Sequence, residues 1–326
     1  YKQIKEVLFH LESWIPKQKP NKAKFTMMQY YFRLIFYLMI FDLQNENKQN
    51  YHTLLLKNNQ KINLKLFCLN ASDFIKACIK KSVSTSVFSA TLLPMDYFEE
   101  MIYFAEENAE TLELMSPFDQ KNCGLFIYSS VNTEYKFREN SYREIAEIIN
   151  ETVNQKPGNY LIFFPSYHYL NQVLDIYQSL NQNFEVMIQE KNMNEEQRDN
   201  FLSRFNDNNQ ALVGFVVLGG IFGEGIDLVG ENLIGAVIVG VGLPQLNIEK
   251  DLINAYYKIK QKNGFDYAYR FPGFNKVLQA AGRVIRTEQD KGIILLIDQR
   301  YIDNRYKILF PPEWNHNKRA SSSSVL

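Results

Sequence analysis

Residues 279–292 read QAAGRVIRTEQDKG and directly precede the apolar run at 293–297. As a helix, turning about 100° per residue, this stretch places Gln279, Arg283 and Arg286 in one narrow stripe, with its apolar residues opposite, where they would pack on a sheet. Two guanidinium groups and a carboxamide on one ridge suit the binding of a phosphoryl group in its transition state. The alternative is a solvated polar face that carries two arginines.

The chain after residue 119 alternates apolar runs with helical patterns, which is typical of a parallel sheet with crossover helices. Asn194 is well placed to cap a helix that carries Glu195 and Glu196 in its first turn. The fold class that we expect is therefore α/β, with helices on both faces of a parallel sheet. The predicted strands are 125–129, 160–164, 184–188, 212–218, 233–240 and 292–298.

The first 118 residues are expected to form a mainly helical segment. Residues 1–66 are predicted as helices, because 30–41 is a dense run of aromatic and aliphatic side chains. Polar residues around 115–123 mark a boundary, so we expect a second domain at 119–316 and a disordered tail at 317–326. Three short elements are predicted before that boundary: strands at 64–69 and 83–88, and a helix at 73–80.

The bulk composition excludes several classes of protein. The 326 residues hold 36 Lys plus Arg and 36 Asp plus Glu, so no overall basic field indicates a nucleic-acid coat. Three cysteines are too few for a disulfide framework, a four-cysteine zinc site or an iron–sulfur cluster, and we expect no metal site in this chain. The most apolar stretch, 27–43, is interrupted by Gln29, Arg33 and Asp42, so we expect no membrane span and a cytoplasmic protein.

A second glycine-rich motif, GGIFGEGIDL at 219–228, follows the predicted strand at 212–218. Its glycines let backbone amides approach a ligand closely, and their GxxGxG spacing differs from the dinucleotide pattern GxGxxG. Glu224 and Asp227 would repel phosphates, so we expect them to accept hydrogen bonds from ribose hydroxyls or to orient arginines such as Arg283. The alternative is merely a tight turn.

Two further stretches combine hydroxyl or aromatic groups with a predicted strand end. FSATLLPMDYF at 88–98 offers the hydroxyls of Ser89 and Thr91. They would either link a nucleotide cleft to a DNA groove or cap a turn. LIFFPSYHYL at 161–170 offers Ser166, either as a helix cap or facing nucleic acid, with Tyr167 beside it.

Residues 243–274 interleave aromatic and cationic side chains, a combination suited to stacking on single-stranded nucleic acid. The alternative is that the aromatic residues form part of the core. The candidates for stacking and phosphate contact are Tyr256, Tyr257, Tyr269 and Arg270.

These stretches together resemble the motifs of superfamily 2 helicases, specifically the DinG/XPD group of DNA helicases. QAAGRVIRTEQD resembles motif VI, GGIFGEGIDL motif V, LIFFPSYHYL motif IV and FSATLLPMDYF motif III, where Ser89, Ala90 and Thr91 form the core. The resemblance runs from about residue 64 to 314. It implies a RecA-like second motor domain, preceded by a mainly helical remnant of the first.

The resemblance also implies the cofactors and roles. In this family ATP, with Mg²⁺, lies between the two motor domains, and translocation on single-stranded DNA runs in the 5′ to 3′ direction. Arg283 and Arg286 would reach the triphosphate, with Gln279 near the γ-phosphate or the attacking water. Nucleotide binding or coupling would fall to the motif V residues Gly223, Glu224, Gly225 and Asp227.

The departure from the family is large, because this chain has no GxxxxGK[ST] loop and no Asp-Glu pair. We therefore expect the C-terminal part of an ATP-dependent DNA helicase that is inactive alone. Its partners would be the remaining motor domain and single-stranded or tailed DNA, and the magnesium ligands would lie outside this chain. The alternatives are a non-catalytic RecA-like binding module for nucleic acid or protein, and a different nucleotide-dependent enzyme. Whether the parent protein holds an iron–sulfur cluster stays open.

Overall fold

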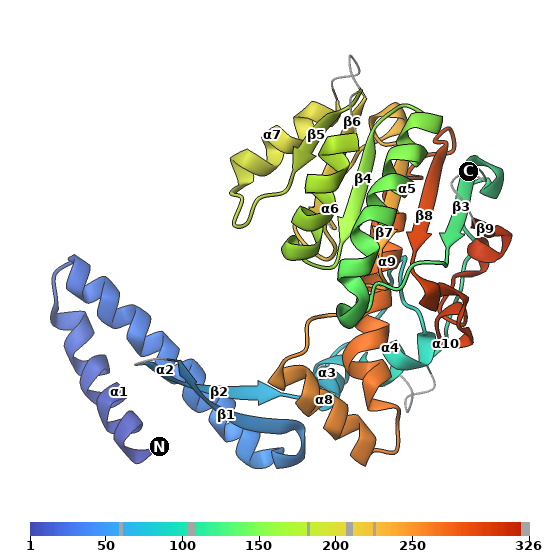
Figure 1. Cartoon of the computed structure of the whole chain (residues 1–326). Helices are drawn as coiled ribbons and strands as arrows, with labels where there is room; N and C mark the ends of the chain where they lie inside the picture. The colour runs from blue at the N-terminus through green and yellow to red at the C-terminus, as the bar shows by residue number, and fades with distance from the viewer. Residues whose placement is uncertain (59–60, 103–108, 181–182, 207–210, 224–225, 321–326) are drawn as a thin grey trace. The chain divides into compact units, whose positions relative to one another are not determined.

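The computed structural model describes residues 1–58, 61–102, 109–180, 183–206, 211–223 and 226–320 (Figure 1). Contacts divide the chain into two compact units, Tyr1–Thr85 with Met101–Tyr103, and Ser86–Glu100 with Phe104–Leu326. These contact-defined units are not the two motor domains expected from the motifs, so the boundary at residue 118 stays a prediction.

The first unit begins with α1 (Lys2–Trp14) and α2 (Lys22–Glu46). Helix α2 is apolar nearly all round and exposes Phe25, Phe32 and Phe36 by 59%, 60% and 61%. A helix with this composition is normally buried, so the surface of α2 has the character of an interface. No described helix, α2 included, has the length and apolar composition that crossing a bilayer requires.

The prediction of helices up to residue 66 is wrong for the rest of the first unit, which contains two strands that begin before that residue. Strand β1 (Tyr51–Asn58) pairs antiparallel with β2 (Lys61–Cys68), and α3 (Ser72–Ile79) follows. A short apolar run does not distinguish helix from strand by itself, and here pairing between the two runs decides for strand. The predicted helix at 73–80 and strand at 64–69 are confirmed.

The predicted strand at 83–88 is absent from the structure. Val83 and Phe88 are exposed by 107% and 91%, and within the described residues no neighbouring strand pairs with this segment. An isolated strand leaves its backbone groups unpaired, so it does not form. Helix α4 (Met95–Ile102) follows.

The second unit is built on a seven-stranded sheet in which every neighbouring pair is parallel. All six strands predicted after residue 119 are present, with ends that differ by two residues at most, so the α/β expectation is confirmed. The strand order is β5-β6-β4-β7-β8-β3-β9. The strands are β3 (Cys123–Tyr128), β4 (Tyr160–Phe164), β5 (Glu185–Ile188), β6 (Leu212–Val217), β7 (Gly235–Val239), β8 (Gly292–Ile297) and β9 (Lys318–Ala320).

Helices cover both faces of this sheet (Figure 1). The side chains of α5 (Tyr142–Gln155) and α6 (Tyr167–Leu180) form one core layer with the strands. Those of α7 (Glu195–Phe205) and α9 (Phe271–Ala281) form the other. Because both faces are covered, every residue of β4 is buried, which explains its unbroken apolar sequence. Asn194 caps α7 as predicted, in a capping box.

The edge of the sheet differs from the sequence prediction. Residues 318–320, which we expected in a disordered tail, form β9 and pair with the second half of β3. The pairing satisfies backbone groups that β3 would otherwise leave open at the sheet edge. Residues 321–326 of the predicted tail lie outside the described residues.

The segment between β7 and β8 is helical. It contains α8 (Ile248–Ile259) and a π-helix (Asp266–Arg270) that runs directly into α9, whose second residue is Pro272. The short helix α10 (Asn304–Lys307) follows β8.

Candidate functional site

The motif at residues 279–292 is not one helix. Helix α9 ends at Ala281, and Gly282 is its C-cap, with φ −66° and ψ 1°. Gln279 therefore lies in the last turn of α9, whereas Arg283 and Arg286 lie in the loop that leads to β8. The prediction of a single helical stripe is wrong, because the backbone after Gly282 forms hydrogen bonds outside the helical pattern.

Asp290 provides those hydrogen bonds. Its carboxylate, 3% exposed, accepts from the backbone N–H groups of Arg286 (2.7 Å), Thr287 (2.8 Å) and Gly230 (3.0 Å). The Thr287 hydroxyl donates to the same group at 2.8 Å. Asp290 thus fixes the loop that carries Arg286 and ties it to the start of the segment before β7. We missed this residue, although the T-x-x-D spacing of Thr287 and Asp290 is a known capping pattern.

The charge of Asp290 should make stability depend on pH. Burial alone would raise the pKa of this carboxyl, but the donors from Arg286, Thr287 and Gly230 outweigh it and hold the pKa below its usual value. A carboxyl whose pKa is lower in the folded than in the unfolded protein stabilises the fold at pH above its unfolded-state pKa. This stabilisation is lost as the pH falls and the carboxyl takes up a proton. We therefore expect the free energy of unfolding, measured by urea titration, to decrease as pH falls below about 4.

The Asp290→Asn variant should be less stable at neutral pH and should lose part of this acid dependence. Asp303→Asn is the positive control. Hydrogen bonds from Arg305 lower the pKa of Asp303 to about 2, so Asp303 also makes stability decrease on acidification. An Asp290→Asn protein with the full wild-type acid dependence would contradict the assignment.

Arg283 holds the glycine-rich loop. Its guanidinium donates to the carbonyl oxygens of Ile226 (3.0 Å) and Gly223 (2.8 Å), one on each side of residues 224–225. Glu224 and Gly225, both predicted as site residues, lie outside the described residues. The structure thus brings motifs V and VI together, and the described hydrogen bonds of Arg283 go to backbone carbonyl oxygens of motif V.

Arg286 forms the second link between the two motifs. Its Nη2 lies 3.1 Å from Oδ1 of Asp227, and the two side chains are 34% and 72% exposed. An exposed ion pair of this kind contributes little to stability and exchanges readily with other ions. Gln279 is half-buried, and its side chain has no hydrogen-bond partner among the described residues.

The motif III residues form a turn. Thr91 donates its backbone N–H to the Ser89 hydroxyl oxygen at 3.2 Å, and both Ser89 and Ala90 are exposed. The turn follows irregular backbone instead of the strand that we expected.

The motif IV residues are held by local contacts. Ser166 accepts the N–H of Tyr169 at 3.3 Å, so it caps α6, while Tyr167 accepts a hydrogen bond at 2.9 Å from the amide of Gln189. Capping, the alternative that we left open for Ser166, is present. Whether Ser166 and Tyr167 also face nucleic acid stays a prediction.

The aromatic residues proposed for base stacking belong to the core. The residues Tyr256, Tyr257 and Tyr269 are only 8%, 1% and 2% exposed, and the Tyr269 hydroxyl donates to Asp251 at 2.8 Å. Arg270 is 6% exposed and pairs with an aspartate one turn earlier at 2.6 Å. The stacking interpretation is therefore wrong for this conformation, because no ring presents an open face to a base.

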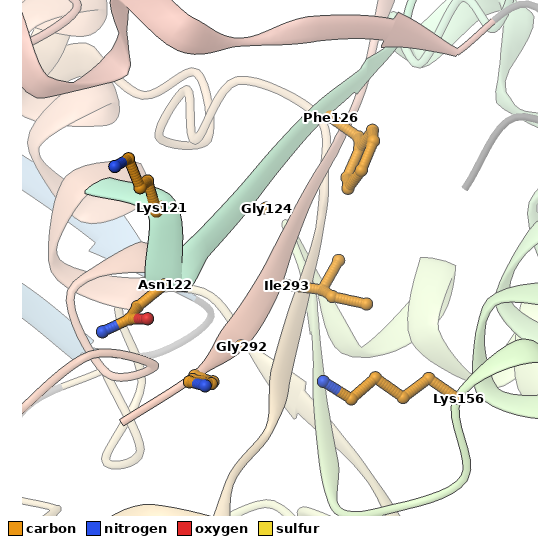
Figure 2. A pocket seen from close by; sticks show the side chains of 8 residues that line it. Lys121, Asn122, Gly124, Phe126, Lys156, Gly292 and Ile293 are labelled. Atoms are coloured by element: carbon orange, nitrogen blue, oxygen red, sulfur yellow. The ribbon is translucent and has the colours of Figure 1, made fainter. Parts of the chain in front are cut away.

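A pocket of about 330 Å³ lies elsewhere, at the amino ends of β3 and β8 (Figure 2). Lysines from three segments surround it: Lys121, Lys156 and Lys291. None of the predicted site residues lines this pocket, although Lys291 and Gly292, at the end of the motif at residues 279–292, do. Among the described residues, no group of His, Cys, Asp and Glu side chains is arranged to hold a metal ion.

Comparisons with known proteins agree with the motifs. The XPD helicase subunit of general transcription and DNA repair factor IIH from Dictyostelium discoideum is 26% identical over 270 residues, which cover 76% of this chain and 34% of that protein. The ATP-dependent DNA helicase DinG from Photobacterium profundum is 27% identical over 239 residues, covering 69% of this chain and 33% of that protein. The chain thus spans about a third of the length of these relatives.

The fold comparison is consistent with these relatives. A solved structure of apo XPD matches with a TM-score of 0.63 at 18% sequence identity, over 93% of this chain and 63% of that one. This match confirms the RecA-like helicase fold. The model of the helicase C-terminal domain family matches residues 149–317, more than half of the chain. The chain therefore belongs to the helicase C-terminal domain family, as the C-terminal part of a DinG/XPD-type superfamily 2 helicase.

Proposed function

We propose that this chain is the C-terminal motor part of an ATP-dependent DNA helicase that translocates 5′ to 3′ on single-stranded DNA. In this proposal Arg286 is the arginine finger of an ATP site completed by the other motor domain. The observation that supports it most directly is the Arg286–Asp227 pair, an exposed cation beside a glycine-rich loop. A guanidinium in that position is available to a phosphoryl group.

The residues at the surface where motifs V and VI meet fit a nucleoside triphosphate. Arg286 is fixed through its backbone by Asp290, while its side chain is held only by the exposed Asp227. A γ-phosphate carries more charge than one carboxylate and would compete for the guanidinium. ATP, when bound with Mg²⁺ held by the other motor domain, supplies the phosphoryl group that is transferred to water.

Arg283 has a different role in this proposal. Its hydrogen bonds of 3.0 and 2.8 Å go to carbonyl oxygens of the motif V loop, so it positions that loop beside Arg286. Release of Asp227 by Arg286 would change the contacts of the same loop. Asp227 thereby couples the nucleotide site to the loop, and Gln279, close in sequence on α9, would approach the γ-phosphate or the attacking water.

The partners follow from the same proposal. The remaining motor domain of the polypeptide would cover exposed apolar surface, and the exposed phenylalanines of α2 provide such a surface. Single-stranded DNA, or DNA with a single-stranded tail, would be the substrate, in a cytoplasmic protein.

We expect the 326-residue chain alone to show no ATPase activity, because it lacks a phosphate-binding loop. The full-length protein should hydrolyse ATP, and single-stranded DNA should raise its turnover. Both proteins are measured by phosphate release with and without oligothymidylate. DNA-stimulated turnover by the isolated chain would refute the first expectation. A full-length protein with no turnover would favour the rival, a RecA-like binding module.

A further inference from the structure

The carboxyl edge of the seven-stranded sheet contains the point where the chain changes direction. From β4 the chain continues to β5 and β6 on one side, whereas β7 leads to β8 on the other, and β4 and β7 are neighbours. In open parallel sheets, ligands bind outside the carboxyl ends of the strands at such a point. The arrowheads of the strands mark this edge in Figure 1.

One cation at this edge is Arg138, in the 3₁₀ helix Tyr135–Ser141 that follows β3. Its Nε donates to the carbonyl oxygen of Thr133 at 3.1 Å, and its guanidinium carbon lies 4.9 Å from the ring centroid of the buried Tyr169. Thr133 in turn lies against Gly240 at the end of β7, since an added Cβ there would meet its hydroxyl at 3.0 Å. Arg138 is thus held rigidly beside the point where the chain changes direction.

A second cation, Lys276 of α9, lies at the end of β6. Its side chain covers Gly219, where an added Cβ would meet Lys276 Cδ at 2.7 Å and Nζ at 3.1 Å. Gly219 has φ +72°, a conformation that favours glycine, and it is the first residue of the motif V loop. The ammonium group therefore lies next to exposed backbone at the carboxyl end of a strand adjacent to β4.

Neither cation has a carboxylate partner in the part of the chain that the structure describes. Burial and the cationic Arg300 lower the pKa of Arg138, and burial and the cationic Lys250 lower the pKa of Lys276. The nearby Asp298 does not compensate Arg138, because it is saturated by Arg300 and Thr133. Two half-buried, uncompensated cations on one sheet edge create a positive field for an anion.

We propose that Arg138 and Lys276 bind backbone phosphates of single-stranded DNA along the carboxyl edge of this sheet. The inference rests on the proposed helicase function and adds two residues that no motif contains or marks as DNA-binding. Fixed cations at two places along an edge suit a polyanion better than one small ion. Phosphate contacts of this kind carry no sequence information, as translocation requires.

The test uses the full-length protein with Arg138→Gln, Lys276→Gln and the double variant. Affinity for fluorescent oligothymidylate is measured by anisotropy over a series of KCl concentrations. Each single change should weaken binding about tenfold at low salt. Each should also lower the slope of log affinity against log salt by about 0.7.

Lys121→Gln with Lys156→Gln is the matched control, because it removes two positive charges at the opposite edge of the sheet, around the pocket of Figure 2. It should leave affinity and slope unchanged. Arg138→Lys keeps the charge and should keep the slope. The ATPase assay should show a raised DNA concentration for half-maximal stimulation and an unchanged turnover at saturating DNA.

The outcomes separate this inference from the proposed function. If the wild type binds DNA and the double variant binds it with the same affinity and the same salt slope, this inference is overturned, while the proposed function stands. Equal losses in Arg138→Lys and Arg138→Gln, with wild-type slopes, would also overturn it, since they indicate a structural role. A wild-type protein that neither binds DNA nor hydrolyses ATP would overturn the proposed function and the inference together.

Discussion

Replacing Arg286 with alanine is expected to lower the DNA-stimulated ATPase turnover of the full-length protein about a thousandfold, the usual effect of losing an arginine finger. The structure explains why stability should not change. The Arg286 side chain makes only an exposed ion pair with Asp227, and its loop is held by Asp290 through the backbone N–H, which alanine retains. Turnover at saturating ATP and DNA is the quantity to measure.

Arg143→Ala is the matched control, because Arg143 also forms an exposed ion pair, with Glu147, and should leave turnover unchanged. Arg283→Ala should differ from Arg286→Ala in one respect. It leaves the carbonyl groups of Gly223 and Ile226 without a donor, so it should lower stability by about 1–3 kcal/mol as well as turnover. An Arg286→Ala protein with wild-type turnover would rule out the finger assignment.

Replacing Asp298 with alanine is expected to produce the largest loss of stability in the second unit. Asp298 is fully buried at the end of β8, where Nε and Nη2 of Arg300 each donate to it at 2.8 Å and the Thr133 hydroxyl also donates. The Arg300 side chain is only 18% exposed. Removing the carboxylate leaves the guanidinium of Arg300 buried without its counter-charge, and breaking such a buried pair costs about 3–5 kcal/mol.

Urea unfolding of the chain, followed by circular dichroism, measures this loss as a lower midpoint with an unchanged m-value. Glu147→Ala is the control, since its pair with Arg143 is exposed and should contribute about 0.5 kcal/mol or less. If Asp298→Ala costs no more than this control, solvent or another group must compensate Arg300, and the buried network does not hold this end of the sheet together.

The strands of the second unit could be predicted because their sequence reports burial directly. A strand covered on both faces, such as β4, is apolar throughout, and its shortness favours a strand over a helix. Strand β9 could not be predicted in this way. Two of its three residues, Lys318 and Arg319, are charged and exposed, and the segment forms a strand only because β3 offers an open edge.

The candidate site was partly predictable. Glycine spacing and the two arginines identified the surfaces of motifs V and VI, and these surfaces meet through Arg283 and Arg286. The end of α9 was not predictable from periodicity, because the stripe pattern continues past Ala281. Periodicity describes which residues would share a face if the backbone stayed helical, not whether it does.

The sequence by itself thus determined the α/β architecture, the order of the motifs and the family, since all three depend on local composition and spacing. Only the tertiary structure decided what each charged side chain does. Arg283 binds backbone while Arg286 stays available, and Tyr257 is core instead of a stacking platform. The physical reason is that hydrogen bonds and burial depend on groups far apart in the chain, such as Gly230 and Asp290, which only folding brings into contact.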